Sequence, residues 1–294
     1  MIEAKVRLAQ KSDKEAVLAF CQNTWKNQKD FVEAFWDKWL CDQKGYLFVA
    51  TITDVPVAII KIDIVSNLEA WWKALRVDSY YRRRGLSKIL DSHVTHYLRE
   101  NNINISRCCV YSDNEIMVDI MSKRGREKIG SYLHYQAESI NSQNIQLIKF
   151  NLDDEDFIWS EISNFEILDE NQKLYASLIT KFQKLTTDLL KERLSQEKVW
   201  GLKQDNRLLS IAIESYSEVS SQELFYIGYM NAINKDKLAL LLYELRKLAY
   251  SKGYKVVRSI FPSNDVFKTS LSIANYQKLI ETEAWLYEWE NSDA

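Results

Sequence analysis

The sequence repeats one order of predicted elements at a separation of about 150 residues, and this repeat restricts the fold more than any other feature. In both halves, the spacing of apolar residues predicts a hairpin, a further strand and then an amphipathic helix. The first set covers residues 45–63, 69–77 and 87–102, and the second covers residues 198–216, 223–233 and 235–253. A period of this length is too long for a solenoid, so it indicates two copies of one domain.

The predicted fold class is α/β, because strands and helices alternate and a lone helix follows a run of strands. We expect two tandem domains, residues 1–150 and 151–294, each a mixed, mostly antiparallel sheet flanked by helices. The acidic segment NLDDEDF, near residue 152, is the predicted junction. Length alone does not decide between one domain and two.

The composition is that of a globular chain, with 46% hydrophobic and 27% charged residues. No apolar run approaches the roughly 20 residues of a membrane helix, and the start of the sequence has no secretory apolar region. We therefore expect a cytoplasmic protein without a membrane partner. The four cysteines lack CxxC spacing and the three histidines are scattered, so no metal site is predicted.

The two halves of the chain differ in charge. Residues 1–150 carry 22 Lys and Arg against 18 Asp and Glu, a net charge of +4, whereas residues 151–294 carry 17 against 23, a net charge of −6. A mildly basic first half suits a small polyanionic ligand. It lacks the strong basic bias of a nucleic-acid binder, so no nucleic-acid partner is expected.

Three successive arginines lie between the third strand and the helix of the first copy, in the segment LRVDSYYRRRGLS over residues 75–87. Gly85 stands directly before that helix, in a chain with only seven glycines. Unpaired N–H groups at a helix start bind phosphate, and a glycine lets the ligand approach them closely. Arginines add charge-assisted hydrogen bonds to phosphate oxygens. The segment predicts a site for a phosphate-bearing ligand; a solvated turn is the alternative.

This segment resembles the central motif of the GNAT acetyltransferase superfamily, in which a strand and a (Gln/Arg)-x-x-Gly-x-(Gly/Ala) loop lead into a helix. Ser87 stands where relatives have Gly or Ala. The resemblance covers most of residues 1–140 and, more weakly, the second copy. It implies acetyl-CoA as acyl donor, with its pantetheine arm between strands 69–77 and 105–112. The implied cofactor-binding residues are Leu75, Arg76, Val77, Arg82, Arg83, Arg84, Gly85, Leu86, Ser87, Lys88 and Asn114. For Asn114, capping of the following helix is the alternative role.

The resemblance also implies that a primary amine attacks the thioester directly after losing a proton. Glu69 is the predicted general base, acting directly or through water, and Asp63 is the reserve candidate. The tyrosine that often serves as general acid falls near Met121, so the acid is not identified. We expect an acetyl-CoA-dependent N-acetyltransferase that modifies a small-molecule amine or a free amino acid. The alternatives are transfer of a different acyl group and a non-catalytic coenzyme A-binding regulatory module.

The second copy differs from the first at the corresponding loop. Where the first has DSYYRRRGLSKIL, the second has NAINKDKLALLLY, with no glycine and no arginine cluster. Asp236 places a carboxylate at the helix start, where phosphate would have to bind. We therefore expect the second copy not to bind acetyl-CoA.

Overall fold

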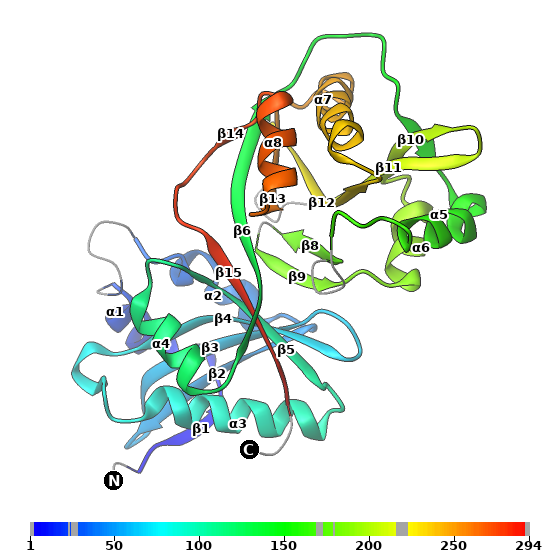
Figure 1. The fold of residues 1–294 in the computed structure, drawn as a ribbon. Helices are drawn as coiled ribbons and strands as arrows, with labels where there is room; N and C mark the ends of the chain where they lie inside the picture. The colour runs from blue at the N-terminus through cyan, green and yellow to red at the C-terminus, as the bar shows by residue number, and fades with distance from the viewer. Residues whose placement is uncertain are drawn as a thin grey trace. The chain divides into compact units, whose positions relative to one another are not determined.

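The computed structural model describes residues 3–22, 24, 29–168, 173–178, 180–215 and 223–291, coloured along the chain in Figure 1. The chain forms two compact units. The first unit is Met1–Cys108 together with Glu288–Ala294, and the second unit is Cys109–Tyr287. These bounds differ from the predicted ranges 1–150 and 151–294, because the end of the chain belongs to the first unit and the boundary between the units lies within β5.

The first unit contains a mixed sheet in the order β1–β2–β3–β4–β5. Neighbouring strands are antiparallel except β4 and β5, which are parallel. The elements are β1 (Lys5–Leu8), η1 (Lys11–Asp13), α1 (Lys14–Cys21), α2 (Val32–Leu40), β2 (Gly45–Ile52), β3 (Val55–Ile64), β4 (Glu69–Val77), η2 (Ser79–Tyr81), α3 (Leu86–Glu100) and β5 (Ile105–Tyr111).

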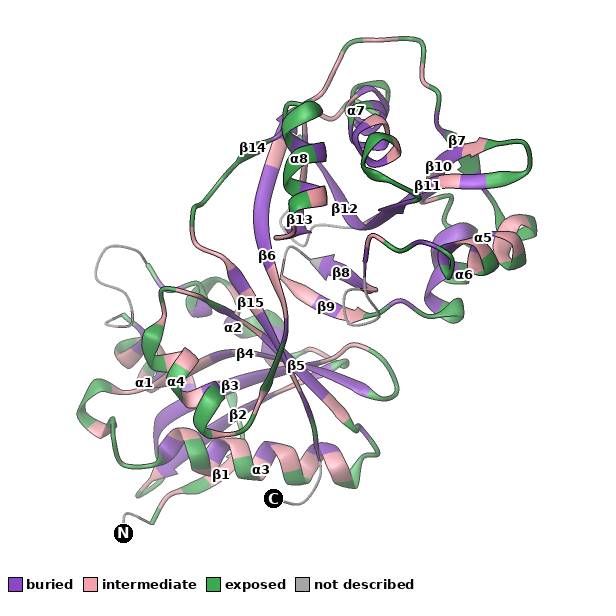
Figure 2. Cartoon of the chain, viewed as in Figure 1, coloured by how far each residue is buried: buried purple, intermediate pink, exposed green. Residues whose placement is uncertain are grey.

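Helices cover both faces of this sheet, because successive strand residues point to opposite sides. Leu47 and Val49 on β2 pack with α1 and α2, in a core that also contains Trp36. Phe48, between them, contacts the ring of Tyr97 on α3 at a centroid distance of 5.4 Å. Figure 2 shows the buried residues concentrated on the central strands. The core is thus centred on β2 and β3, and it holds β4 and α3 in place.

The second unit contains a sheet in the order β7–β10–β11–β12–β13–β6, in which only β12 and β13 are parallel. Its elements are α4 (Glu115–Lys123), β6 (Glu127–Glu138), β7 (Ile148–Phe150), η3 (Leu152–Asp154), α5 (Glu155–Ile162), β8 (Leu174–Leu178), β9 (Lys181–Lys184), α6 (Thr187–Ser195), β10 (Val199–Gln204), β11 (Arg207–Glu214), β12 (Leu224–Ala232), α7 (Lys235–Ser251), β13 (Val256–Pro262), α8 (Asp265–Ile273), β14 (Gln277–Lys278) and the first part of β15 (Ala284–Glu290), a strand whose residues from Glu288 onward belong to the first unit. β8 pairs with β9, and β14 pairs with β6. The predicted end of the hairpin at residue 216 lies outside the described residues.

The two units share local geometry, as the sequence repeat predicts. The hairpins β2–β3 and β10–β11 both turn on two residues with positive φ, Thr53-Asp54 and Asp205-Asn206. Both hairpins shift register in the second strand, two residues after the turn. In each unit the third strand also shifts register, and it pairs with a parallel neighbour at three positions. The α/β class and the mostly antiparallel sheets are confirmed.

Candidate functional site

The connection between β4 and α3 is a tight turn that ends at Gly85. Asp78 opens it, because its Oδ1 accepts a hydrogen bond from the Tyr80 backbone N–H at 3.0 Å. Gly85 directly precedes the first turn of α3 and has a φ of 82°. This left-handed conformation costs a residue with a Cβ about 1 kcal/mol or more, so the backbone favours glycine here.

The start of α3 is open to an anion. Gly85 has no side chain to cap the helix, and the first turn contains no acidic residue. The Gly85 carbonyl accepts hydrogen bonds from the N–H groups of Lys88 and Ile89, at 2.9 and 3.0 Å. The preceding N–H group of the helix, that of Leu86, has no acceptor within the helix itself. No heavy atom lies within 4 Å of the point that a Gly85 Cβ would occupy. Such a helix start attracts negative charge.

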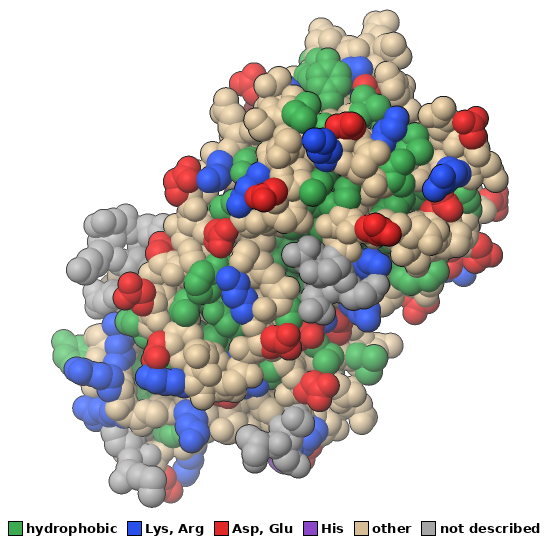
Figure 3. All heavy atoms as spheres, in the orientation of Figure 1, with side chains coloured by type: hydrophobic (Ala, Val, Ile, Leu, Met, Phe, Trp, Pro, Cys, Tyr) green, Lys and Arg blue, Asp and Glu red, His purple; other side chains and the backbone are tan. Residues whose placement is uncertain are grey.

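Arg82, Arg83 and Arg84 are exposed around this helix start. Arg82 donates from Nε to the Val77 carbonyl at 3.3 Å, and the Arg84 guanidinium lies 5.3 Å from the centre of the Tyr81 ring. On the face drawn in Figure 3, Lys and Arg side chains gather at the edge of the first unit where α3 begins. Three guanidinium groups beside an uncapped helix start can bind a diphosphate.

The predicted strand site at Leu75–Val77 lies next to a bulge in β4. Ala74 has a φ of 55°, and the register shifts there, because Ile59 pairs with Arg76 whereas Lys61 pairs with Lys73. Among the described residues, β4 pairs with β5 only as far as Trp71, as expected if the two strands splay. Backbone groups of β4 beyond that point can therefore bind a ligand instead of a strand.

Side chains already engage two of the backbone carbonyls in this strand site. The Leu75 carbonyl accepts a hydrogen bond from Arg76 Nη1 at 3.0 Å, and the Val77 carbonyl accepts one from Arg82. Arg76 is itself fixed, because its Nε donates to Asp30 Oδ2 at 2.7 Å. The Arg76 side chain thus holds the bulged strand in position. The backbone of β4, and not this side chain, is therefore the part that can bind a ligand.

Glu69, the predicted base, begins the same strand. It lies five positions before Ala74, which places it about 16 Å along the strand at 3.3 Å per residue. Its side chain is buried, with Oε1 2.5 Å from Arg107 Nη1 and Oε2 accepting from the Ser66 hydroxyl at 3.2 Å. A base this far from the bulge reaches an amine there only through intervening water.

Asp63, the reserve candidate, lies between two ammonium groups. Lys73 Nζ is 2.7 Å from Asp63 Oδ2, and Lys61 Nζ is 3.1 Å from Asp63 Oδ1. Lys61 is fully buried and also contacts Asp42 at 2.6 Å. Its ammonium passes over Gly45, where any side chain would clash with it. Because two cations stabilise the carboxylate of Asp63, it is a poorer proton acceptor than a carboxylate that shares one cation.

The remaining predicted position, Asn114, belongs to the second unit. Its Oδ1 accepts a hydrogen bond from the Met117 N–H at 3.3 Å, so it caps α4, the alternative role considered for it. Met121, where relatives often have a tyrosine, is buried on α4. Within the first unit, the structure brings the arginine loop, Gly85 and Leu75–Val77 together, and it places Glu69 at the far end of the same strand.

Two charged residues near Glu69 were missed by the sequence analysis. Arg107 lies on β5 and Glu288 lies near the end of β15, and their side chains meet with Arg107 Nε 2.6 Å from Glu288 Oε2. Each lies inside a mostly apolar or aromatic strand, ISRCCVY and AWLYEWE. A charged residue in a buried strand requires a partner of opposite charge. A charged residue within a mostly apolar strand is therefore the sequence signal that could have indicated this pair.

A mixed sheet with a bulged fourth strand and a helix that begins after a glycine is the arrangement of the GNAT fold. Residues 14–125 match the model of the Acetyltransferase (GNAT) family. This match lies within residues 14–125, and the likeness of the whole chain to a tandem GNAT protein is one of fold. No curated protein matches the sequence.

Two solved structures show the same fold over the whole chain. One is a GCN5-related N-acetyltransferase from Sphaerobacter thermophilus, with 10% identity and a TM-score of 0.62, covering 99% of this chain and 96% of that one. The other is a tandem GNAT protein from the clavulanic acid biosynthesis pathway, with 10% identity and a TM-score of 0.57, covering 99% of this chain and 100% of that one. Among the described residues, no helix combines the length and apolar character needed to cross a membrane.

Proposed function

We propose that the first unit is an acetyl-CoA-dependent N-acetyltransferase that acetylates a small primary amine. The observation that carries this proposal is the start of α3, where Gly85 has a φ of 82°, no side-chain cap is present and three exposed arginines, Arg82, Arg83 and Arg84, directly precede the glycine. An uncapped, cation-lined helix start suits the diphosphate of coenzyme A. The resemblance favours a small amine or free amino acid as acceptor. A cytoplasmic location agrees with four cysteines that form no disulfide.

In this proposal, each group of the chain has a separate task. The helix N–H groups and the guanidinium groups hold the diphosphate, and Gly85 lets it approach. Acetyl-CoA supplies the activated acyl thioester. Backbone N–H groups of β4 beyond the bulge polarise the acyl carbonyl, which carries negative charge as the amine attacks. Glu69 accepts, through water, the proton that the acceptor ammonium must lose before attack.

Calorimetric titration with acetyl-CoA tests the cofactor site. Wild-type protein should bind one equivalent per chain, and Gly85→Glu should weaken binding at least roughly 100-fold, because it adds a carboxylate where phosphate must lie. Gly253→Glu is the matched control, since Gly253 has a φ of 84° and equally open surroundings, but lies after α7. Equal losses in both variants, or no binding by the wild type, would contradict the proposal.

A non-catalytic coenzyme A-binding module is the second candidate, favoured by the distance of Glu69 from the bulge and by its bond to Arg107. Turnover of a panel of small amines separates the two functions. An enzyme should lose about 100-fold in kcat with Glu69→Gln while its affinity for acetyl-CoA holds. Binding without turnover on any amine would support the module, and turnover with another acyl-CoA in preference would redefine the acyl donor.

A further inference from the structure

We propose that Glu288, near the end of the chain, positions Glu69 for proton transfer by acting through Arg107. This inference rests on the proposed role of Glu69 as general base. Glu288 and Glu69 are separated by more than two hundred positions in the sequence, yet both belong to the first unit. Glu288 is a positioning residue in this scheme, because it contacts Arg107 and not the reacting atoms.

The three side chains form a continuous ionic chain. Arg107 contacts Glu69 through one nitrogen, with Nη1 2.5 Å from Oε1. It contacts Glu288 through two, with Nε and Nη2 at 2.6 and 2.5 Å from the same Oε2. Two contacts fix the plane of a guanidinium group, whereas one contact leaves it free to turn. Glu288 therefore determines how Arg107 presents Nη1 to Glu69.

The neighbours of Glu288 are themselves held in place. The Trp289 ring lies 5.1 Å from the Trp72 ring in an edge-on arrangement. Asn291 is buried, and its Oδ1 accepts a hydrogen bond from the Ser106 hydroxyl at 2.8 Å. The Asn291 Nδ2 donates to the Ile103 carbonyl at 2.8 Å. Trp289 thus contacts β4, and Asn291 is hydrogen-bonded to β5 and to Ile103, which lies shortly before that strand.

The second unit shows that the sheet does not require this ionic chain. In the parallel pair β12–β13, Arg258 occupies the register position that Arg107 has in β4–β5, because Tyr226 pairs with Arg258 as Trp71 pairs with Arg107. Leu224 stands at the position of Glu69. Arg258 donates to an uncharged partner, the Oε1 of Gln136, at 2.5 and 3.1 Å. The same fold therefore accepts one arginine with a neutral partner, and two carboxylates in the first unit point to a further role.

The charges around Arg107 indicate what the role of the two carboxylates is. Arg107 carries one positive charge and faces two carboxylates, so neither has the cation to itself. Asp63 and Lys61 on β3 and Lys73 on β4 lie on the same face, and these three are joined to one another and to Asp42 by ion pairs. Removing the charge of Glu288 would leave the full field of Arg107 to Glu69, which would then hold its charge more firmly and accept a proton less readily.

The test compares Glu288→Gln with wild type in the full chain. Carbon-13 NMR of the Glu69 carboxyl group, assigned with Glu69→Gln, follows its protonation without need of a substrate. We expect Glu288→Gln to move the midpoint of that titration to lower pH, because Arg107 would then face one carboxylate instead of two. The acid limb of kcat/KM against pH should move in the same direction. Arg107→Gln should move both to higher pH, because it removes the cation and leaves the buried Glu69 carboxylate beside the half-buried Glu288 carboxylate.

Arg258→Gln is the matched control, since it changes the equivalent arginine of the second unit and should leave both midpoints unchanged. Glu288→Gln keeps the size and the acceptor oxygen of the side chain, so it decides the question even if Arg107→Gln fails to fold. Unmoved midpoints in a folded Glu288→Gln variant would overturn the positioning role, whether or not turnover occurs. A moved NMR midpoint in a protein that acetylates no amine would instead leave the ionic chain standing and reject the proposed function.

Discussion

The two units build the same helix start in opposite ways. α3 follows Gly85, which has no side chain to offer its N–H groups. α7 follows Asn234, whose Oδ1 accepts a hydrogen bond from the Lys237 N–H at 2.9 Å, and Asp236 adds a carboxylate in the first turn. A capped, acidic helix start disfavours phosphate binding, whereas an uncapped, basic helix start favours it. One fold position thus serves either the protein's own stability or a ligand.

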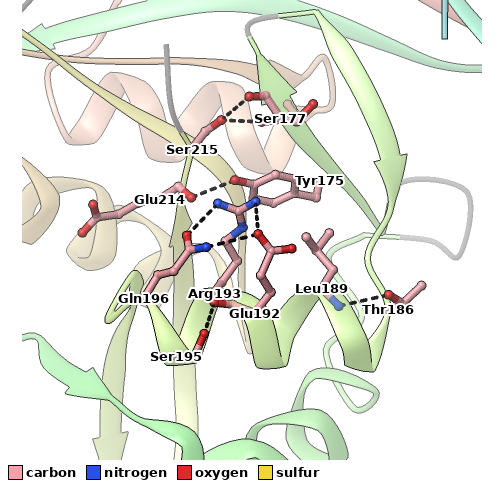
Figure 4. Close-up of polar contacts among 11 residues, drawn as sticks. Tyr175, Ser177, Thr186, Leu189, Glu192, Arg193, Ser195, Gln196, Glu214 and Ser215 are labelled. Atoms are coloured by element: carbon pink, nitrogen blue, oxygen red, sulfur yellow. Dashed lines mark hydrogen bonds and ion pairs between the residues drawn. The ribbon is translucent and has the colours of Figure 1, made fainter. Parts of the chain in front are cut away.

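The sheets differ in the same sense. Counted from the matching hairpin turns, Lys61 and Asp63 correspond to Ile213 and Ser215. Figure 4 shows Ser215 directed at strand β8, where its hydroxyl lies 2.9 and 2.8 Å from the carbonyls of Ala176 and Ser177. In the second unit, strand β8 therefore lies against a position whose counterpart in the first unit carries a charged side chain.

The space beside the bulge is also filled in the second unit. Gly228 lies at the register shift of β12, and any side chain there would clash with the ring of Tyr175. Tyr175 is fixed by a hydrogen bond from its hydroxyl to the Glu214 carbonyl at 2.9 Å, as Figure 4 shows. The cavity between β12 and β13 has a volume of about 20 Å³, enough for one water molecule. Side chains of the second unit thus fill the space beside this bulge.

The largest expected effect comes from Lys61→Ile. This change gives the first unit the isoleucine that the second unit has at the corresponding position, Ile213. The change leaves Asp63 and Asp42 without the ammonium group that joins them, so we expect a loss of about 3 kcal/mol or more in the free energy of unfolding. Urea denaturation at neutral pH measures it.

The double variant Lys61→Ile/Asp63→Ser is its control, because it also removes the carboxylate that needed the cation. Most of the lost stability should return, since buried ion pairs can often be replaced by apolar or neutral groups without net cost. An equal loss in both variants would mean that the size of the lysine side chain, and not its charge, matters at this position.

A second prediction concerns pH, because the second unit buries a titratable ring without a charge partner. His134 is 6% exposed, and burial, with a smaller effect of the Arg258 charge, lowers its pKa to about 4 from an ordinary value of 6.5. Between these values the unfolded chain binds a proton that the folded chain does not. The free energy of unfolding should therefore fall by about 2 kcal/mol between pH 6.5 and pH 5.

Urea denaturation at several pH values tests this contribution. His134→Gln should remove it from the pH dependence, whereas His96→Gln, at an exposed position on α3, should retain it. The neutral ring also explains the 3.1 Å contact between the Tyr111 hydroxyl and His134 Nε2, in which the phenol can donate. Identical pH profiles for wild type and His134→Gln would show that this ring does not limit stability in acid.

Local signals in the sequence predicted the repeat, the hairpins and the loop at Gly85, because turn residues and apolar spacing act over a few positions. The partnership of Glu69 with Arg107 and Glu288 could not be predicted, since it depends on where the end of the chain returns. Gly45 and Gly228 carried no readable signal either, as each makes room for a side chain distant in sequence. Local chemistry was readable, whereas contacts between distant segments required the structure.

The smallest expected effect sharpens the contrast between the two helix starts. Asn234→Ala should cost about 1 kcal/mol of stability, because it removes the cap of α7, and Asn234→Gly should cost only a few tenths. Neither should change the affinity for acetyl-CoA. The stricter variant is Asn234→Gly/Asp236→Ser, which gives α7 an uncapped start without its carboxylate. It should still bind one equivalent of acetyl-CoA per chain by calorimetry, because Tyr175 continues to fill the space beside the bulge. A second equivalent in this variant would mean that the helix start alone selects the ligand and that the filled strand site has no influence on binding.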